Sequence, residues 1–303
     1  MIFVGADGGG TGTTLAAYEN GIWIAEAEAG PLNYRFIPPE EAVRHFTEGM
    51  AALGLNPGTV AAVGIADPSL DDEAEAGDEA AARFYGLLRE KLACPVFGRS
   101  DAYITLFGLT GGEGPGVLLI SGTGAMGIAE NEQGEIRTAG GWGRLTGDEG
   151  SGYYIAVGGI RAAAQAADGI APATGLTEAL LKRVGASSPR ELIPILSGDP
   201  EPDIASFARD VADCAGGGDE EAVRILLDAA GWLARYAEVL VRWSGCRRVG
   251  IWGSVLVKNA MVREAFEREL RERLGDAEIV IPPIPAEEAA ARYAEHCLKL
   301  NRE

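Results

Sequence analysis

The chain has 303 residues, of which 47% are hydrophobic and 23% are charged, and its formal net charge is -19. This length exceeds one typical core and favours two domains. The acidity argues against nucleic acid or an anionic membrane as a partner, because such contacts need clustered lysine and arginine. No apolar run is nearly as long as a membrane-spanning helix, and no targeting segment is visible, so we expect a cytoplasmic protein. Whether the protein forms a homodimer stays an open question.

The first chemical signal is a glycine-rich loop close to the start of the sequence. Residues 2–30 (IFVGADGGGTGTTLAAYENGIWIAEAEAG) predict a strand, a Gly/Thr loop, a strand, an Asn-Gly turn and another strand. No lysine follows these glycines until Lys91, which excludes a Walker A loop, and no helix follows as a dinucleotide fingerprint requires. The loop is therefore predicted to lie inside a β-hairpin.

A second stretch repeats this order of elements. Residues 116–141 (GVLLISGTGAMGIAENEQGEIRTAGG) predict a strand, a Gly/Thr loop and two more strands, which indicates an internal duplication. Each loop alone could be a structural turn, but two such loops, one per domain, favour a clamp for a polyphosphate. The predicted phosphate-binding residues are Gly8, Gly9, Gly10, Thr11, Gly12, Thr13, Gly122, Thr123 and Gly124.

An acid stands directly before the first loop. The carboxylate of Asp7 would repel a phosphate unless a cation lay between them. The sequence therefore predicts that Asp7 holds Mg²⁺ in a metal-nucleotide complex.

Further elements follow from apolar spacing. Residues 94–98 predict a strand and residues 102–109 a helix, with Asp101 between them; a helix is expected over 219–243. Residues 247–275 predict a strand, a Gly-Ser turn and one long helix, and a last helix is expected over 287–303. The acidic run within residues 66–79 is interpreted as a solvated loop that leads into a helix.

Four segments together resemble a known family. GADGGGTGTT, RSDAYITLFG, PGVLLISGTGAMG and GGWGRLTGDEGSGYYIA are similar to the successive motifs of the N-acetylglucosamine kinases and BadF/BadG-type ATPases, within the actin and hexokinase superfamily. The match runs in order from residue 1 to about residue 160, and the last block is the most specific of the four.

The resemblance implies roles for individual residues. Asp101 would be the catalytic base that accepts the proton of a sugar hydroxyl as it attacks the γ-phosphate of ATP, although an Asp before a helix is otherwise an N-cap. Asp148 would accept hydrogen bonds from the sugar, although Asp148 or Ser151 could instead cap the next helix. The implied sugar-binding residues are Asn33, Asp101, Gly141, Trp142 and Asp148.

Some segments depart from the family pattern. Where the family has a Gly-Gly pair beside the adenosine, this chain has Gly253-Ser254, preceded by Trp252. Gly253 and Ser254 are still predicted to contact the nucleotide. Because Trp252 could narrow the adenine pocket or stack on the base, the nucleotide preference stays open. Asp67, Pro68 and Ser69 replace a Gly-Ala-Gly stretch near the sugar. If Asp67 reached the sugar, its charge would favour a free amino sugar such as glucosamine.

The expected architecture is α/β, with two ribonuclease-H-like (actin-like ATPase) domains whose mixed sheets flank a nucleotide cleft. The expected domains are residues 1–112, joined by the helix 287–303, and residues 113–286. The expected function is ATP- and Mg²⁺-dependent phosphorylation of N-acetylglucosamine or glucosamine at the 6-hydroxyl. Two alternatives stay open: an ATPase that activates a partner enzyme such as a dehydratase, and a non-catalytic sugar sensor. The first needs cysteines that share an iron-sulfur cluster, and Cys94, Cys214, Cys246 and Cys297 form no such motif.

Overall fold

The computed structural model describes residues 1–70, 78–196, 198 and 203–301, and its internal contacts divide the chain into two units. Unit 1 comprises Met1–Gly116, Glu130–Arg137 and Pro282–Glu303, and unit 2 comprises Val117–Ala129 and Thr138–Ile281. The acidic residues 71–77, for which a solvated loop is predicted, lie outside the described residues. Among the described helices, none is both long and apolar enough to span a membrane.

Unit 1 is built on a mixed sheet with the strand order β3-β2-β1-β4-β5. β1 runs antiparallel to β2 and parallel to β4, which is parallel to β5. The strands are β1 (Ile2–Gly8), β2 (Thr13–Glu19), β3 (Ile22–Ala29), β4 (Val60–Asp67) and β5 (Val96–Ser100). The helices are α1 (Pro39–Ala52), α2 (Glu79–Lys91), α3 (Asp101–Thr110) and α11 (Ala286–Leu300).

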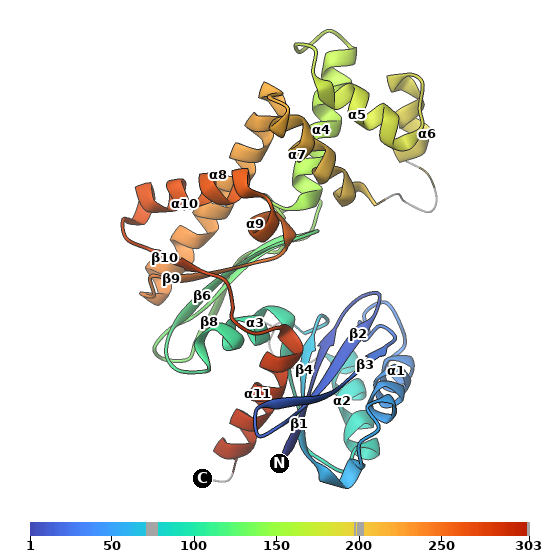
Figure 1. Cartoon of the computed structure of the whole chain (residues 1–303), viewed down its shortest axis with the longest axis vertical. Helices are drawn as coiled ribbons and strands as arrows, with labels where there is room; N and C mark the ends of the chain where they lie inside the picture. Colours follow the sequence, from blue (N-terminus) through green and yellow to red (C-terminus); the bar gives the residue numbers. More distant parts are fainter. Residues whose placement is uncertain (71–77, 197, 199–202, 302–303) are drawn as a thin grey trace. The chain divides into compact units, whose positions relative to one another are not determined.

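The C-terminal helix α11 packs directly on β1 and β4 of unit 1 (Figure 1). A Cβ atom on Gly5 would lie 1.8 Å from the carbonyl oxygen of Glu287, and one on Gly64 would lie 1.8 Å from that of Ala290. Since real side chains cannot approach a backbone so closely, these two glycines let the helix backbone lie against the sheet. The first and last parts of the chain are thereby joined in one core.

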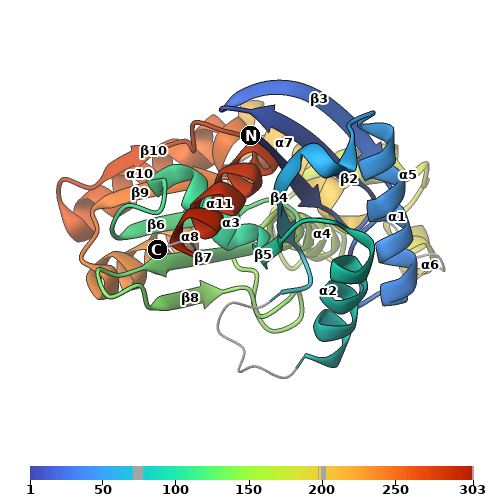
Figure 2. The ribbon, with the colours of Figure 1, turned by 90° about the horizontal axis from the view of Figure 1, so that it is seen from below.

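The opposite face of this sheet is covered by α1 and α2 (Figure 2). Val4 and Val63 project into this second core, where Phe46 and Phe84 are fully buried. Because side chains alternate along a strand, the residues of β1 and β4 divide between the α11 face and the α1/α2 face.

Unit 2 repeats the plan of unit 1. Its sheet has the order β10-β9-β6-β7-β8, which is the order of the first sheet with the equivalent strands β5-β4-β1-β2-β3. The duplication predicted from the two glycine loops is therefore confirmed in the strand order. The strands are β6 (Gly116–Ser121), β7 (Ala125–Glu130), β8 (Ile136–Gly140), β9 (Arg248–Trp252) and β10 (Glu278–Val280).

Helices supply most of the unit 2 core. The longest is α8 (Glu220–Ser244), where Leu226, Leu233 and Leu240 repeat every two turns and are buried. The other helices of unit 2 are α4 (Gly152–Ala167), α5 (Gly175–Val184), α6 (Leu192–Leu196), α7 (Ala208–Gly216), α9 (Ser254–Lys258) and α10 (Ala260–Leu274), with short 3₁₀ turns at Pro189–Glu191 and Ile204–Phe207. A further 3₁₀ turn, Pro57–Thr59, belongs to unit 1.

The prediction of a single long helix after β9 is wrong, because two helices, α9 and α10, follow this strand. Asn259 has an extended backbone (φ -93°, ψ 101°), and its side chain accepts a hydrogen bond of 3.1 Å from the N–H of Val262. Asparagine competes for backbone groups in this way and favours helix caps over helix interiors. It therefore ends α9 and starts α10.

Candidate functional site

The first glycine loop connects β1 and β2 in unit 1. The N–H of Gly9 donates to the carbonyl of Gly12 at 2.8 Å, and a Cβ atom on Gly9 would lie 2.6 Å from that oxygen, so the tight turn itself requires this glycine. A Cβ atom on Gly10 would meet nothing within 4 Å, and Gly10 has no positive φ. Neither a neighbouring atom of the described residues nor the backbone conformation requires glycine at position 10. The absence of a side chain there would let a ligand approach the backbone closely.

The threonines of this loop differ in their environment. Thr11 is exposed, whereas Thr13 is 1% exposed and its hydroxyl donates to the carbonyl of Gly30 at 2.8 Å. The Thr13 hydroxyl therefore holds β2 to the chain after β3 and is directed away from the loop surface. Gly8 also supports the fold, since its Cβ would lie 3.0 Å from the carbonyl oxygen of Ala66.

Asp7 lies at the end of β1 among other acids. Burial raises its pKa from 3.8 to about 6, and the negative charges of Glu287 and then Asp101 add to this rise. All three residues belong to unit 1, so the fold gathers carboxylates from β1, α3 and α11. An accumulation of negative charge of this kind is stabilised by a bound cation.

Asp101 begins α3 directly after β5, and it is exposed. The N-cap of α3 is Ser100, whose hydroxyl oxygen accepts from the N–H of Tyr103 at 3.0 Å. The Asp101 side chain instead accepts from the N–H of Ala102 at 2.8 Å. Ser100, and not Asp101, is therefore the N-cap of α3. The Asp101 carboxylate lies at the surface, where its charge acts on Asp7.

Asp67 does not face a ligand. Its side chain is fully buried and accepts hydrogen bonds from the hydroxyls of Tyr34 (2.9 Å) and Tyr85 (2.8 Å) and from the N–H of Ser69 (2.9 Å). Burial raises the pKa of Asp67, and these hydrogen bonds oppose that rise. Asp67 therefore cannot select a free amino sugar by direct contact, and the expectation that it could reach the sugar is wrong.

The second glycine loop joins β6 and β7 in unit 2. The N–H of Gly122 donates to the carbonyl of Gly124 at 2.9 Å, and a Cβ atom on Gly122 would meet nothing within 4 Å. Gly253 has a φ of +89° and its Cβ would lie 2.3 Å from the carbonyl oxygen of Ser121, so only glycine fits there. Gly253 and the exposed Ser254 therefore adjoin the second loop, as the nucleotide assignment of both requires.

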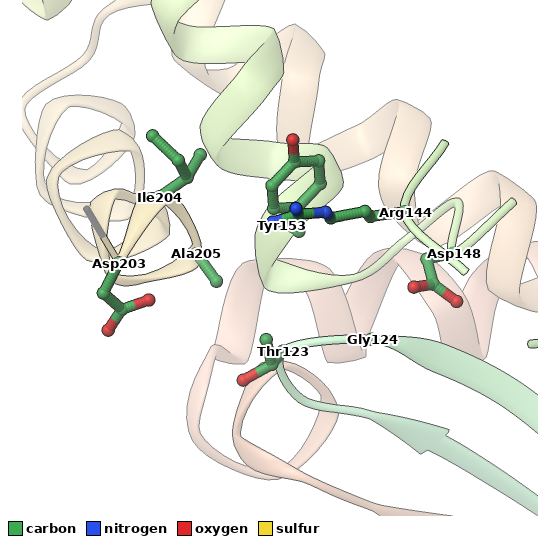
Figure 3. Close-up of a pocket in the computed structure, with 8 residues that line it drawn as sticks. All are labelled: Thr123, Gly124, Arg144, Asp148, Tyr153, Asp203, Ile204 and Ala205. Atoms are coloured by element: carbon green, nitrogen blue, oxygen red, sulfur yellow. The ribbon is translucent and has the colours of Figure 1, made fainter. Parts of the chain in front are cut away.

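A pocket of about 330 Å³ opens beside the second loop (Figure 3). Its lining comes from the loop, the segment before α4, the first turn of α4, and the 3₁₀ turn before α7. The residues are Thr123, Gly124, Arg144, Asp148, Tyr153, Asp203, Ile204 and Ala205. Asp148 and Asp203 lie at opposite sides of the pocket, and the Arg144 guanidinium lies over the Tyr153 ring at 5.6 Å from its centroid.

Asp148 has an unusual backbone for a residue other than glycine, with a φ of +60°. A Cβ atom on Gly124 would lie 3.2 Å from one carboxylate oxygen of Asp148, so the glycine leaves room for this side chain. Burial raises the pKa of Asp148, while hydrogen bonds from the backbone of Ala125 and Gly143 act in the opposite direction. Ser151 caps α4, so Asp148 is not the cap, and its strained backbone directs a carboxylate into the pocket.

The remaining predicted sugar contacts lie elsewhere. Trp142 is 78% exposed and stands outside the set of described residues that line the pocket; Gly141 precedes it with a φ of +73°. Asn33 belongs to unit 1, where its side-chain oxygen accepts hydrogen bonds from Ser69 and Arg35. The predicted sugar residues are thus divided between the two units.

Comparison with known proteins gives the family. The profile of the BadF/BadG/BcrA/BcrD ATPase family matches residues 4–291. The chain belongs to this family. The resemblance inferred from the four motifs is therefore confirmed, and so is the expected α/β architecture of two actin-like domains with mixed sheets.

Two relatives of the chain are named as sugar kinases. The chain is 27% identical to the N-acetyl-D-glucosamine kinase of Dictyostelium discoideum over 92% of this chain and 93% of the relative. It is 32% identical to the N-acetylmuramic acid/N-acetylglucosamine kinase of Clostridium acetobutylicum over 75% of each chain. A crystal structure of a candidate N-acetylglucosamine kinase from Chromobacterium violaceum is 25% identical, with a TM-score of 0.73 over 96% of this chain and 97% of that one.

In each unit the fold of this ATPase family member brings further residues, which the sequence motifs alone do not single out, to the predicted site residues. Glu287 lies close enough to raise the pKa of Asp7, but a glutamate in the first turn of a helix is common and gave no signal. Arg144 stands inside the quoted GWGRLTGDEG block and could have been noticed as its only cation. Asp203 lies in a segment with no motif, and only the tertiary structure places it at the pocket.

Proposed function

We propose that this protein is an ATP-dependent kinase that phosphorylates an amino sugar, N-acetylglucosamine or glucosamine, at its 6-hydroxyl. The observation that supports it most is the exposed Asp101 carboxylate beside Asp7 in a family member whose relatives are named N-acetylglucosamine kinases. A carboxylate at a strand end, next to a phosphate loop and a metal-binding acid, suits a base that accepts a hydroxyl proton during phosphoryl transfer.

Each set of residues has one task in this proposal. The open backbone at Gly10 and Gly122 binds phosphate oxygens through N–H groups, and Gly253 and Ser254 lie along the nucleoside. Asp101 holds the sugar hydroxyl and accepts its proton. Asp148 accepts hydrogen bonds from other hydroxyls, and Asn33 donates to the sugar. Positioning and charge neutralisation account for most of the catalysis in such a reaction.

The residues around Asp7 fit a divalent cation. No group of three or more His, Cys, Asp or Glu side chains that could hold a metal by itself occurs in the described part of the chain. Mg²⁺ commonly binds through one or two carboxylates together with phosphate oxygens and water, so Asp7 would hold it jointly with the nucleotide. When bound, Mg²⁺ would neutralise charge on the transferring phosphoryl group.

The cytoplasm suits this proposal, because ATP is available there and reducing conditions keep thiols free. Cys94, Cys214, Cys246 and Cys297 are all free cysteines.

The test is ADP release from Mg²⁺-ATP in the presence of N-acetylglucosamine, glucosamine, N-acetylmuramic acid, glucose or no sugar, with the phosphorylated position assigned by NMR. We expect release that depends on an amino sugar. Asp101→Asn should remove it, and Asp276→Asn, at a side chain that is 99% exposed, is the matched control. Equal release with and without sugar would instead support an ATPase, and no release with any sugar would contradict the kinase assignment.

A further inference from the structure

Asp67 anchors a hydrogen-bonded network in unit 1 that has no part in the phosphate site. Two tyrosine hydroxyls and one backbone N–H converge on its carboxylate, which is fully buried. A Cβ atom on Gly98 would lie 1.8 Å from the Tyr85 hydroxyl oxygen, so glycine in β5 is needed for Tyr85 to reach Asp67. Strand β5, helix α2 and the segment after β3 are thereby adapted to one buried acid.

The network continues from Asp67 to Asn33 through Ser69. Ser69 is also fully buried, and its backbone N–H donates to Asp67. The Ser69 hydroxyl lies 3.1 Å from Asn33 Oδ1 and donates to it, while the Ser69 carbonyl accepts from Arg35 Nε at 2.9 Å. A buried charge is thus linked in two steps to a half-buried amide.

The amide of Asn33 can adopt only one orientation in this network. The backbone N–H of Arg35 lies 3.2 Å from the same Asn33 oxygen, and an N–H can only donate. The group that Arg35 contacts must therefore be the amide oxygen, which settles the usual uncertainty between Oδ1 and Nδ2. With Oδ1 occupied by two donors, Asn33 offers a ligand the donors of its Nδ2 group.

Asp67 acts on the opposite face of the sheet from Asp7. Gly64 of β4 faces α11, and Asp67, three residues later, faces α1 and α2 instead. Asp7 shares the α11 face with Gly5, two residues before it. The Asp67 network is therefore separate from the acids around Asp7, and a change in it should not alter the binding of Mg²⁺-ATP.

We propose that Asp67 and Ser69 are positioning residues that hold Asn33 with its amide donors toward the sugar, so that this contact recognises an acceptor oxygen. The proposal rests on the proposed sugar kinase function. A hydroxyl or acetamido carbonyl oxygen can accept from Asn33, whereas a protonated amine at the same place finds no acceptor. Asp67 thus influences the choice of sugar from the interior, through Ser69 and Asn33.

Ser69→Ala tests this most cleanly, since it removes one hydroxyl and keeps the N–H that binds Asp67. We expect the KM for the sugar to rise about fivefold, as for one lost hydrogen bond, with kcat and the KM for ATP unchanged. In an Asn33→Ala background, Ser69→Ala should cause no further rise, because Ser69 acts only through Asn33. Ser244→Ala, which removes another buried serine hydroxyl in unit 2, is the matched control.

A second measurement does not depend on the sugar. The side-chain amide of Asn33, identified by its loss in Asn33→Asp, should be rigid by NMR relaxation in the wild type and mobile in Ser69→Ala. An unchanged KM, a rise that adds to that of Asn33→Ala, or an equally rigid Asn33 amide in Ser69→Ala would each overturn the proposal. If the wild type phosphorylated no sugar, the function would be wrong, and the NMR result would still decide whether Ser69 positions Asn33.

Discussion

Replacement of Asp7 by asparagine should make the protein more stable and inactive at the same time. Burial raises the pKa of Asp7 from 3.8 to about 6, with added contributions from Glu287 and Asp101. The folded protein therefore holds the ionised form of Asp7 less well than the unfolded chain does. Asparagine is similar in size and carries no charge, so it removes this penalty.

The sign and size of the effect follow from linkage. Well below pH 3.8 the carboxyl is protonated in both states and costs nothing, whereas stability is lost as the pH rises from about 3.8 to about 6, above which the loss is nearly complete. The difference between 3.8 and about 6 corresponds to about 3 kcal/mol. Asp7→Asn should thus raise the free energy of unfolding by up to about 3 kcal/mol at pH 8, but by only about 1 kcal/mol at pH 4.5.

Urea unfolding of both proteins at these two pH values, without nucleotide or Mg²⁺, measures the gain. Asp276→Asn is the control, since its 99% exposed side chain should change stability by less than about 0.5 kcal/mol. A gain that is absent at pH 8, or equally large at both pH values, would refute the explanation that burial and the neighbouring acids destabilise the ionised carboxylate of Asp7. Added Mg²⁺-ATP should stabilise the wild type and have much less effect on Asp7→Asn.

Three further predictions concern the sugar, the base and the core. Asp101→Asn should lower kcat by at least about 100-fold and leave the Kd for ATP nearly unchanged, so turnover close to the wild type would exclude it as the base. Asp148→Ala should raise the Kd for the sugar about tenfold before it affects ATP binding, and calorimetry with an unaltered Kd would remove Asp148 from the sugar site. Gly64→Ala should lower the free energy of unfolding, measured with urea, by about 3 kcal/mol, because its Cβ would lie 1.8 Å from the carbonyl oxygen of Ala290. Gly231→Ala is the control: its Cβ would lie in open space on α8, so the change should be neutral or stabilising. Equal effects of the two substitutions would contradict this explanation.

The sequence predicts the two hairpins well because their signals are local. Alternating apolar residues, an Asn-Gly turn and glycine loops define the strands before and after each loop, and the shared strand order follows from the repeat. The packing of α11 could not be predicted in this way. Gly5 and Gly64 look like ordinary strand glycines, and the helix that requires them begins more than 220 residues further along the chain, at Ala286.

The candidate site residues show the same contrast between local motifs and contacts made far along the chain. Asp7, Asp101 and Asp148 each stand in a compact motif, so sequence reasoning could assign them before any contact was known. Their electrostatic partners belong to other elements: Glu287 comes from α11, and Asp203 comes from the turn before α7. Residue types can therefore be predicted from motifs, whereas pKa values depend on neighbours that only the fold supplies.

The three acids at the ends of β1, β4 and β5 show why an acid at a strand end has no fixed role. Asp7, Asp67 and Asp101 stand at the same edge of one parallel set of strands. Asp67 meets three hydrogen-bond donors and is satisfied inside the protein, whereas the negative charges of Glu287 and Asp101 act on Asp7, which suits its proposed role as a cation ligand. Asp101 lies one residue beyond its strand, where Ser100 takes the cap and leaves the carboxylate exposed. The face of the sheet and the identity of one neighbour thus distinguish a buried structural anchor from the proposed metal ligand and the proposed base.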